Sequence, residues 1–177
     1  MNERKDVITM KGEPLTLLGT EVKTGESAPD FEAIANDLSA VKLSDFRGKV
    51  VIISSVPSLD TPVCDKTTRL FNAEAGKLGE DVVVLTVSMD LPFAQGRWCG
   101  AAGVENVQTI SDHRKAEFGT RYGLLIEQLR LLARAVLVVD REGTIRHFEL
   151  VKELTSEPDY DVVLETTRRL LYERTKT

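Results

Sequence analysis

The chain has 177 residues, of which 42% are hydrophobic and 29% charged, and this balance excludes disorder, collagen-like repeats and a coiled coil. Its 23 Lys and Arg against 28 Asp and Glu give a net charge of −5, so it lacks the basic surface that nucleic acid or an anionic membrane usually requires. Two cysteines, Cys64 and Cys99, are too few for a disulfide-stabilised secreted scaffold. No repeat or linker interrupts the sequence, so residues 1–177 are expected to form a single domain.

The N-terminal segment predicts no secretory signal, because the charged residues 1–6 are followed by short alternating segments rather than by a continuous apolar stretch. Apolar runs such as 135–139 are far shorter than the stretch of about 18 residues that a membrane span needs. We therefore expect a cytoplasmic protein that makes no contact with a membrane. In that compartment thiols stay reduced, and disulfides tend to be transient and catalytic.

In chain order, the first predicted element is a β-hairpin over about residues 7–18, which turns at Gly12. Residues 49–56 (KVVIISSV) then form a continuous apolar run rich in β-branched side chains, typical of a strand buried on both faces. A helix is predicted over 61–78, and residues 81–88 repeat the strand pattern. Such a β-α-β unit implies that its two strands are parallel.

The second half of the chain continues the alternation. Asp90 is a suitable N-cap for a short helix that ends near residues 100–103, and Gly96 and Gly100 weaken that helix. The remaining predicted elements are a strand at 106–110, a short helix at 114–122, a hairpin with strands 136–140 and 144–151, and a helix at 156–171 in which Ser156 and Asp159 have capping-box spacing. The order β-α-β-α-β-α-β-β-α after an N-terminal hairpin predicts an α/β layered domain, consistent with a thioredoxin-like sheet.

The segment 57–65 joins the end of a buried strand to the start of a helix, which is the edge where open α/β sheets place their sites. Cys64 lies in the first helical turn, where free N–H groups and the helix dipole favour a thiolate. It also shares an apolar stripe with Phe71, so the sulfur should be recessed, and burial makes a cation necessary for activation. The alternative is that Cys64 is a small buried hydrophobe and that Thr61 is only an N-cap.

The pattern Pro57-x-x-x-Thr61-x-x-Cys64 resembles the active-site motif of the peroxiredoxins. Further segments are similar to the thiol peroxidase branch, the atypical two-cysteine peroxiredoxins: SMDLPFAQGRWCG at 88–100, ARAVLVVD at 133–140 and TSEPDY at 155–160. The resemblance covers essentially the whole chain and implies a thioredoxin-like (peroxiredoxin) fold, a central mixed sheet flanked by helices. Pro62 departs from the frequent glycine, but proline suits a first helical turn, so we expect no loss of chemistry.

The resemblance implies that Cys64 is the peroxidatic nucleophile and Cys99 the resolving cysteine, and that the two form a Cys64–Cys99 disulfide within one chain. It gives Arg134, Thr61 and Pro57 supporting roles. The guanidinium of Arg134 would stabilise the thiolate and hold the peroxide oxygens in line, and the Thr61 hydroxyl would bond the substrate. Pro57 has no N–H and would shield the sulfur. Without the resemblance, Arg134 would be interpreted as a surface charge at the start of a strand.

The implied enzyme reduces organic hydroperoxides and hydrogen peroxide through a Cys64 sulfenic acid, is recycled by thioredoxin, needs no cofactor, and is a homodimer serving antioxidant defence and redox homeostasis. The alternative from another class is a redox sensor that uses the same disulfide as a switch. A disulfide needs Cα atoms within roughly 7 Å, so two helix-borne cysteines require local opening, expected at the helix around Cys99 and at the first helical turn at Cys64. In that helix Trp98 is interpreted as a core anchor, or else as a reporter of unfolding.

Metal binding is a weaker interpretation. Cys64, Cys99, His113 and His147 could supply four ligands, but no pair of them has zinc-finger spacing. His113 is expected in a solvated loop and His147 in a hairpin strand. The sequence also contains no phosphate-binding glycine loop, so neither a metal nor a nucleotide site is predicted.

Overall fold

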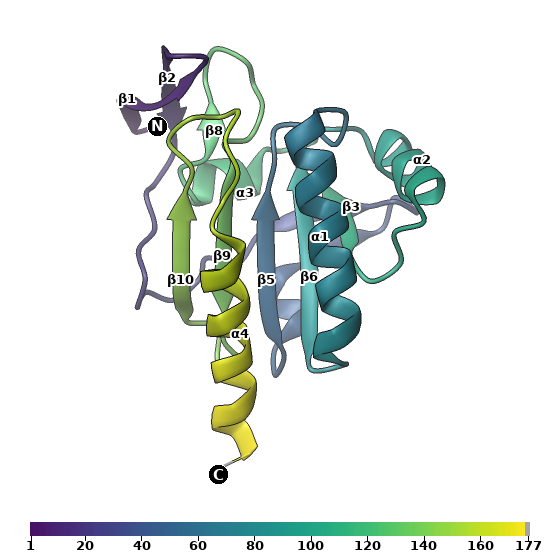
Figure 1. Cartoon of the computed structure of the whole chain (residues 1–177). Helices are drawn as coiled ribbons and strands as arrows, with labels where there is room; N and C mark the ends of the chain where they lie inside the picture. Colours follow the sequence, from purple (N-terminus) through teal and green to yellow (C-terminus); the bar gives the residue numbers. More distant parts are fainter. Residues whose placement is uncertain (176–177) are drawn as a thin grey trace.

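The computed structural model describes residues 1–175, and within them a seven-stranded mixed sheet in the order β10-β9-β5-β6-β7-β3-β4 forms the centre (Figure 1). Its strands are β3 (Glu32–Ala35), β4 (Ala40–Lys42), β5 (Val50–Ser55), β6 (Val82–Ser88), β7 (Gln108–Ser111), β9 (Ala135–Val139) and β10 (Ile145–Leu150). A second sheet, ordered β1-β2-β8, consists of β1 (Glu3–Met10), β2 (Glu13–Leu18) and β8 (Leu125–Ile126). The helices are η1 (Leu43–Phe46), α1 (Pro62–Leu78), α2 (Pro92–Ala102), α3 (Glu117–Arg121) and α4 (Tyr160–Thr175).

Strand β5 lies inside the large sheet, between β9 and β6, and confirms the predicted strand at 49–56. It pairs in parallel with β6 and antiparallel with β9, and all six of its side chains are buried. Val50 and Ile52 pack with α1 and α4, whereas Val51 and Ile53 belong to the core on the opposite face. Because side chains alternate along a strand, β5 supports both layers of the domain. Figure 1 shows α1 and α4 on the near face and α3 behind the sheet.

One end of the large sheet collects several chain segments. The parallel strands β5 and β6 end there, and β9 starts there, since Ser55 pairs with Ala135 in the antiparallel register. Helix α1 begins at the same end, which is the upper end in Figure 1. The predicted β-α-β unit over 49–88 is therefore confirmed, with the start of its helix at this edge.

The N-terminal hairpin is confirmed and is longer than predicted, since β1 begins at Glu3. Its turn places Lys11 at φ 51° and Gly12 at φ 83°, the left-handed values of a tight two-residue hairpin turn. The far side of the hairpin joins the segment after β10, where the Thr9 N–H donates to the Lys152 carbonyl at 2.7 Å and the Leu154 N–H donates to the Thr9 carbonyl at 2.8 Å. The hairpin is thus attached to the end of the large sheet at which α1 begins.

Three predictions were wrong in detail. The helix expected at 156–171 starts at Tyr160, because Pro158 disfavours helical geometry in the residue before it. The helix expected at 114–122 is shortened to α3. Asp90 is not the N-cap of α2: Leu91 occupies that position, without a side-chain capping bond. The short strands β3, β4 and β8 have too few residues to show a periodic pattern and were not predicted.

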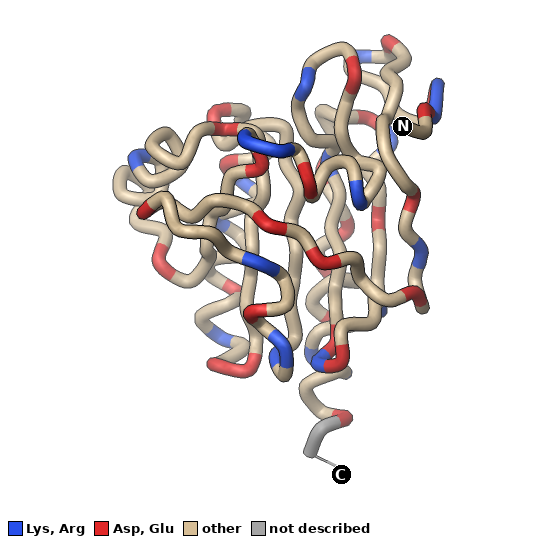
Figure 2. Tube along the Cα trace, turned by 180° about the vertical axis from the view of Figure 1, so that it is seen from behind, with Lys and Arg blue, Asp and Glu red and all other residues tan. Residues whose placement is uncertain are grey.

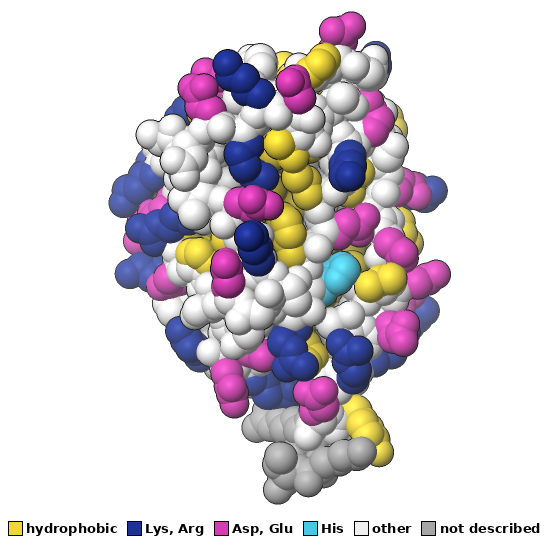
Figure 3. All heavy atoms as spheres, turned by 90° about the vertical axis from the view of Figure 1, so that its left-hand side faces the viewer, with side chains coloured by type: hydrophobic (Ala, Val, Ile, Leu, Met, Phe, Trp, Pro, Cys, Tyr) yellow, Lys and Arg dark blue, Asp and Glu magenta, His cyan; other side chains and the backbone are white. Residues whose placement is uncertain are grey.

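Charges of both signs are interspersed on the molecule. On the face seen in Figure 2, lysine and arginine segments alternate with aspartate and glutamate segments. On the β10 side, Figure 3 shows hydrophobic side chains enclosed by charged ones of both signs. Within the described residues, no helix combines the length and apolarity needed to cross a membrane.

Asp112, directly after β7, should make the free energy of unfolding depend on pH. Its buried carboxylate accepts the N–H groups of Phe118 and Gly119 at 3.0 and 2.8 Å. Burial, opposed by these two bonds, raises the pKa of Asp112 from 3.8 to about 6. Because the folded-state pKa exceeds the unfolded one, this group's stabilisation is present below about pH 4 and is lost as the pH rises through about 6.

We predict that the stability advantage of the wild type over Asp112→Asn shrinks between about pH 4 and pH 6. The decrease should be on the order of 2 kcal/mol, since each unit of pKa difference corresponds to about 1.4 kcal/mol. Urea unfolding of both proteins across this range measures it. A difference that stays constant or grows with pH would contradict the assignment.

Candidate active site

Cys64 is fully buried in the first turn of α1, as its place on the apolar stripe predicted. Thr61 is the N-cap, and its Oγ1 accepts the Cys64 N–H at 3.4 Å while its hydroxyl donates to the Ser58 carbonyl at 3.0 Å. The capping role of Thr61 is therefore confirmed. Pro62 occupies the start of the helix, where its missing N–H removes no helical bond. Helix dipole and free N–H groups together favour negative charge at this sulfur.

Arg134 supplies the cation that a buried thiolate needs. It precedes β9 and is 2% exposed, which rules out the interpretation as a surface charge. Its Nη1 donates to Cys64 Sγ at 3.2 Å, and its Nε donates to the Leu154 carbonyl at 2.9 Å. A guanidinium in contact with sulfur, away from water, stabilises the thiolate more than the neutral thiol.

The loop before α1 is held by an aspartate whose role the sequence did not indicate. Asp90 Oδ1 accepts the Ser58 hydroxyl at 2.7 Å, and Oδ2 accepts the Leu59 N–H at 2.9 Å and the Ser88 hydroxyl at 2.8 Å. One carboxylate thus ties the loop to the end of β6. The available signal was its position directly after a buried strand at the same sheet edge. Pro57, also in this loop, is buried beside Val56 and Leu59, which pack with Cys64.

Cys99 lies on α2 as a half-buried free thiol, and Cys64 is also free. The Cys99 sulfur contacts Thr109 Oγ1 of β7 at 3.4 Å and lines a hollow of about 440 Å³. The neighbouring Trp98 packs instead against the cluster that contains Cys64. Because consecutive helical side chains point about 100° apart, Cys99 faces β7 rather than α1. The structure therefore does not bring the two thiols together, and a bond between them requires α2 to move.

Helix α2 is held by a few side-chain contacts. Gln95, fully buried, donates to Ser88 Oγ and to the Ile110 carbonyl at 2.9 Å each. The Arg69 guanidinium lies 5.6 Å from the centre of the Trp98 ring and donates weakly to the Ala102 carbonyl. Leu91 and Phe93, at the start of the helix, are 53% and 68% exposed. A short helix with exposed apolar side chains and few anchors opens at low free-energy cost.

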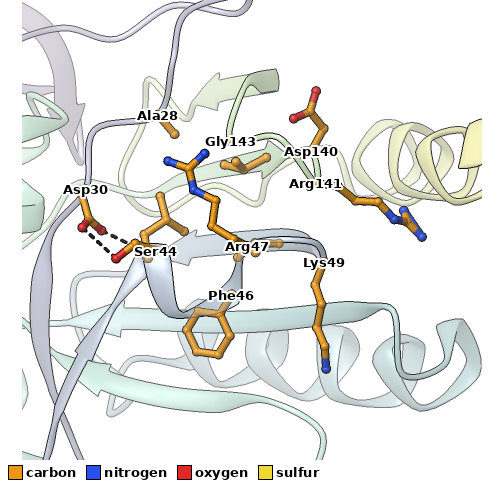
Figure 4. A pocket seen from close by; sticks show the side chains of 12 residues that line it. Ala28, Asp30, Ser44, Phe46, Arg47, Lys49, Asp140, Arg141 and Gly143 are labelled. Atoms are coloured by element: carbon orange, nitrogen blue, oxygen red, sulfur yellow. Dashed lines mark hydrogen bonds between the residues drawn. The ribbon is translucent and has the colours of Figure 1, made fainter.

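Two further features bear on whether the fold holds another site. The pocket in Figure 4 lies between η1 and the β9–β10 turn, at the far end of β5 from Cys64. Its cavity of about 30 Å³ has room for about one water molecule. Arg47 uses its Nη1 to bond the Glu142 carbonyl there. Among the described residues no group of three or more His, Cys, Asp or Glu side chains is arranged to hold a metal ion, and burial lowers the pKa of His147.

The family model described as Redoxin matches residues 23–164. A relative from Oceanobacillus iheyensis named thiol peroxidase is 57% identical over 89% of this chain and 95% of its own length. One of the same name from Bacillus subtilis is 53% identical over 93% of this chain and 98% of its own length. The crystal structure of a peroxiredoxin-like protein from Aquifex aeolicus is 41% identical, with a TM-score of 0.87 over 93% of this chain and 97% of that chain.

The two relatives and the solved structure each cover about nine-tenths of the chain, and they confirm the resemblance to the thiol peroxidase branch of the peroxiredoxins. The predicted fold class, a central mixed sheet flanked by helices, is confirmed as well. The chain therefore belongs to the Redoxin family and has the thioredoxin-like fold of the peroxiredoxins.

Proposed function

We propose that this protein is a thiol peroxidase that reduces organic hydroperoxides and hydrogen peroxide through Cys64. The observation that carries the proposal is the bond from Arg134 Nη1 to the buried Cys64 sulfur at 3.2 Å. Relatives that are 53–57% identical and named thiol peroxidase support it. A buried thiolate beside a guanidinium and a helix N-terminus is a nucleophile matched to a substrate that develops negative charge.

In the first step the Cys64 thiolate attacks the distal oxygen of the hydroperoxide. The S–O bond forms as the O–O bond breaks, so the sulfur is oxidised to a sulfenic acid and the peroxide is reduced. The departing alkoxide or hydroxide takes a proton and leaves as alcohol or water. Arg134 has several donors in one plane and a permanent charge, so it stabilises the charge that moves onto the leaving oxygen. We propose that the Thr61 hydroxyl, which here caps α1 and donates to the Ser58 carbonyl, turns to bond the peroxide, and that Pro57 helps exclude water.

In the second step the Cys99 thiol attacks the sulfenic sulfur of Cys64, water leaves, and an intramolecular disulfide forms. The direction of the Cys99 side chain, toward Thr109, means that α2 opens before this step. A dithiol reductant, which we propose to be thioredoxin, then reduces the disulfide and returns both thiols. The cycle uses sulfur chemistry alone, so the proposal includes no cofactor and no metal. We also propose that the protein acts in the cytoplasm as a homodimer and has no nucleic-acid or membrane partner.

The first test is Cys64→Ser. A serine hydroxyl does not form a stable anion at neutral pH, so peroxide consumption with thioredoxin, its reductase and NADPH should fall to the background rate. The wild type should turn over continuously, whereas a redox sensor would oxidise once and stall. Normal consumption by Cys64→Ser would refute the proposal.

The second test is Cys99→Ser, which keeps the nucleophile and removes the resolving thiol. This variant should consume one equivalent of peroxide and accumulate a sulfenic acid, seen by mass spectrometry as one added oxygen atom. Peptide mapping of the oxidised wild type under non-reducing conditions should give a Cys64–Cys99 link within one chain. Full thioredoxin-supported cycling by Cys99→Ser would show that Cys99 does not resolve the sulfenic acid.

The third test is Arg134→Ala, with Arg114→Ala as the control because Arg114 is an exposed arginine of equal charge. Loss of one donor to a developing anion typically costs about 10²-fold or more in rate, and Arg134→Ala should show a loss of that order. The fluorescence of Trp98, the only tryptophan, follows the reaction in a stopped-flow instrument. Equal rates for Arg134→Ala and the control would exclude the proposed role.

A further inference from the structure

We infer that Glu153 is a positioning residue for Arg134: it orients the Leu154–Thr155 peptide so that its carbonyl accepts Arg134 Nε, and it thereby connects the N-terminal hairpin to the Cys64 site. Its effect on catalysis rests on the proposed function, whereas its effect on the ionisation of Cys64 is measured without turnover. None of the sequence motifs assigned a role to this residue.

The carboxylate of Glu153 accepts four hydrogen bonds, two on each oxygen. Oε1 accepts the Thr9 hydroxyl and the Gly12 N–H of the hairpin, both at 3.0 Å. Oε2 accepts the Thr155 N–H at 2.8 Å and the Thr155 hydroxyl at 2.6 Å. The side chain therefore bridges two segments that are far apart in the sequence. Since charged acceptors make the stronger hydrogen bonds, this bridge restrains both segments.

The bond to the Thr155 N–H determines where the Leu154 carbonyl points. A peptide unit is planar and trans, so its N–H and C=O point in opposite directions. Fixing the Thr155 N–H on Glu153 therefore directs the Leu154 oxygen to the other side, where Arg134 Nε donates to it at 2.9 Å. A carboxylate on the N–H side also polarises the peptide and makes its oxygen a better acceptor for a cation.

The preceding peptide, Glu153–Leu154, is held by the hairpin. The Leu154 N–H donates to the Thr9 carbonyl at 2.8 Å, and the Leu154 side chain is 5% exposed within the core cluster that includes Ile8. The Val151 N–H donates to the Arg134 carbonyl at 2.9 Å. Backbone and side chain of Arg134 are thus both held by the segment that follows β10.

A guanidinium is rigid and planar, so the direction of Nε fixes the direction of Nη1. With Nε on the Leu154 carbonyl, Nη1 meets the Cys64 sulfur at 3.2 Å. If the carbonyl turned away, a buried N–H would lose its partner, and the guanidinium would rotate to recover one. The hairpin, which contributes no side chain to the sulfur, then acts on it through one peptide.

The experiment uses Glu153→Gln in a Cys99→Ser background, where Cys64 is the only thiol. The glutamine amide keeps the shape of the side chain, but its NH2 group faces two of the four groups that donate to Glu153. Those two hydrogen bonds are lost, so the Leu154–Thr155 peptide is less restrained. We expect Cys64 to ionise at higher pH, with the thiolate fraction at neutral pH lowered at least about threefold, as followed by thiolate absorbance. Thr155→Val, which removes only one of the four bonds, should change it in the same direction and by less.

Gln128→Ala is the matched control. Gln128 anchors the hairpin to the segment after β8 through the N–H and hydroxyl of Thr16, and it does not touch Glu153. The substitution Gln128→Ala should loosen the hairpin without changing the ionisation of Cys64. A change equal to that of Glu153→Gln would show that general destabilisation is responsible and would overturn the inference.

A double-mutant cycle separates a path through Arg134 from a direct electrostatic effect. In Arg134→Ala, the further change Glu153→Gln should leave the thiolate titration where it is, because the group being positioned is absent. An equal effect with and without Arg134, or no effect in a folded Glu153→Gln protein, would overturn the inference. Failure of the proposed function looks different: the titrations would depend on Arg134 and Glu153 as expected, while the wild type would not turn over peroxide.

Discussion

The contact between the buried Arg134 guanidinium and the buried Cys64 sulfur organises the candidate active site. Both groups are almost completely buried, and a buried cation is costly unless it faces negative charge. The first turn of α1 favours the same ionised form of the thiol through its dipole and free N–H groups. Burial, which alone would favour the neutral thiol, therefore strengthens the attraction between the two groups once the sulfur is charged.

Strand register makes this contact possible. Because β9 runs antiparallel to β5 and Ala135 pairs with Ser55, the residue before β9 and the loop after β5 lie at one edge of the sheet. A slip of one residue would turn the side chains of β9 to the opposite face and break the two-sided core of β5. The hydrophobic alternation that stabilises the fold thus also fixes the relative position of the cation and the thiol.

Periodic patterns were enough to predict β5, β6, α1 and a recessed thiol at the start of α1, because these features depend on residues near one another in the chain. The positions of Arg134, Asp90 and Glu153 depend on which distant segments meet, and no local pattern encodes that. The residues next to Arg134 in the sequence suggested an exposed charge, and only the family resemblance predicted that it acts at the site. The direction of Cys99 was equally hidden, since α2 has no clear apolar face.

The two thiols occupy settings that suit opposite requirements. In the cycle that we propose, peroxide attack at Cys64 needs a fixed geometry, whereas disulfide formation with Cys99 needs a segment that moves. Asp90 reconciles them, because its carboxylate holds Ser58 and Leu59 from the end of β6 and makes none of these bonds to α2. Gln95 of α2 shares only Ser88 with this network. In the proposed cycle, helix α2 therefore unwinds and releases Cys99 while the Asp90 bonds, the Thr61 cap and the Arg134 contact keep Cys64 in place.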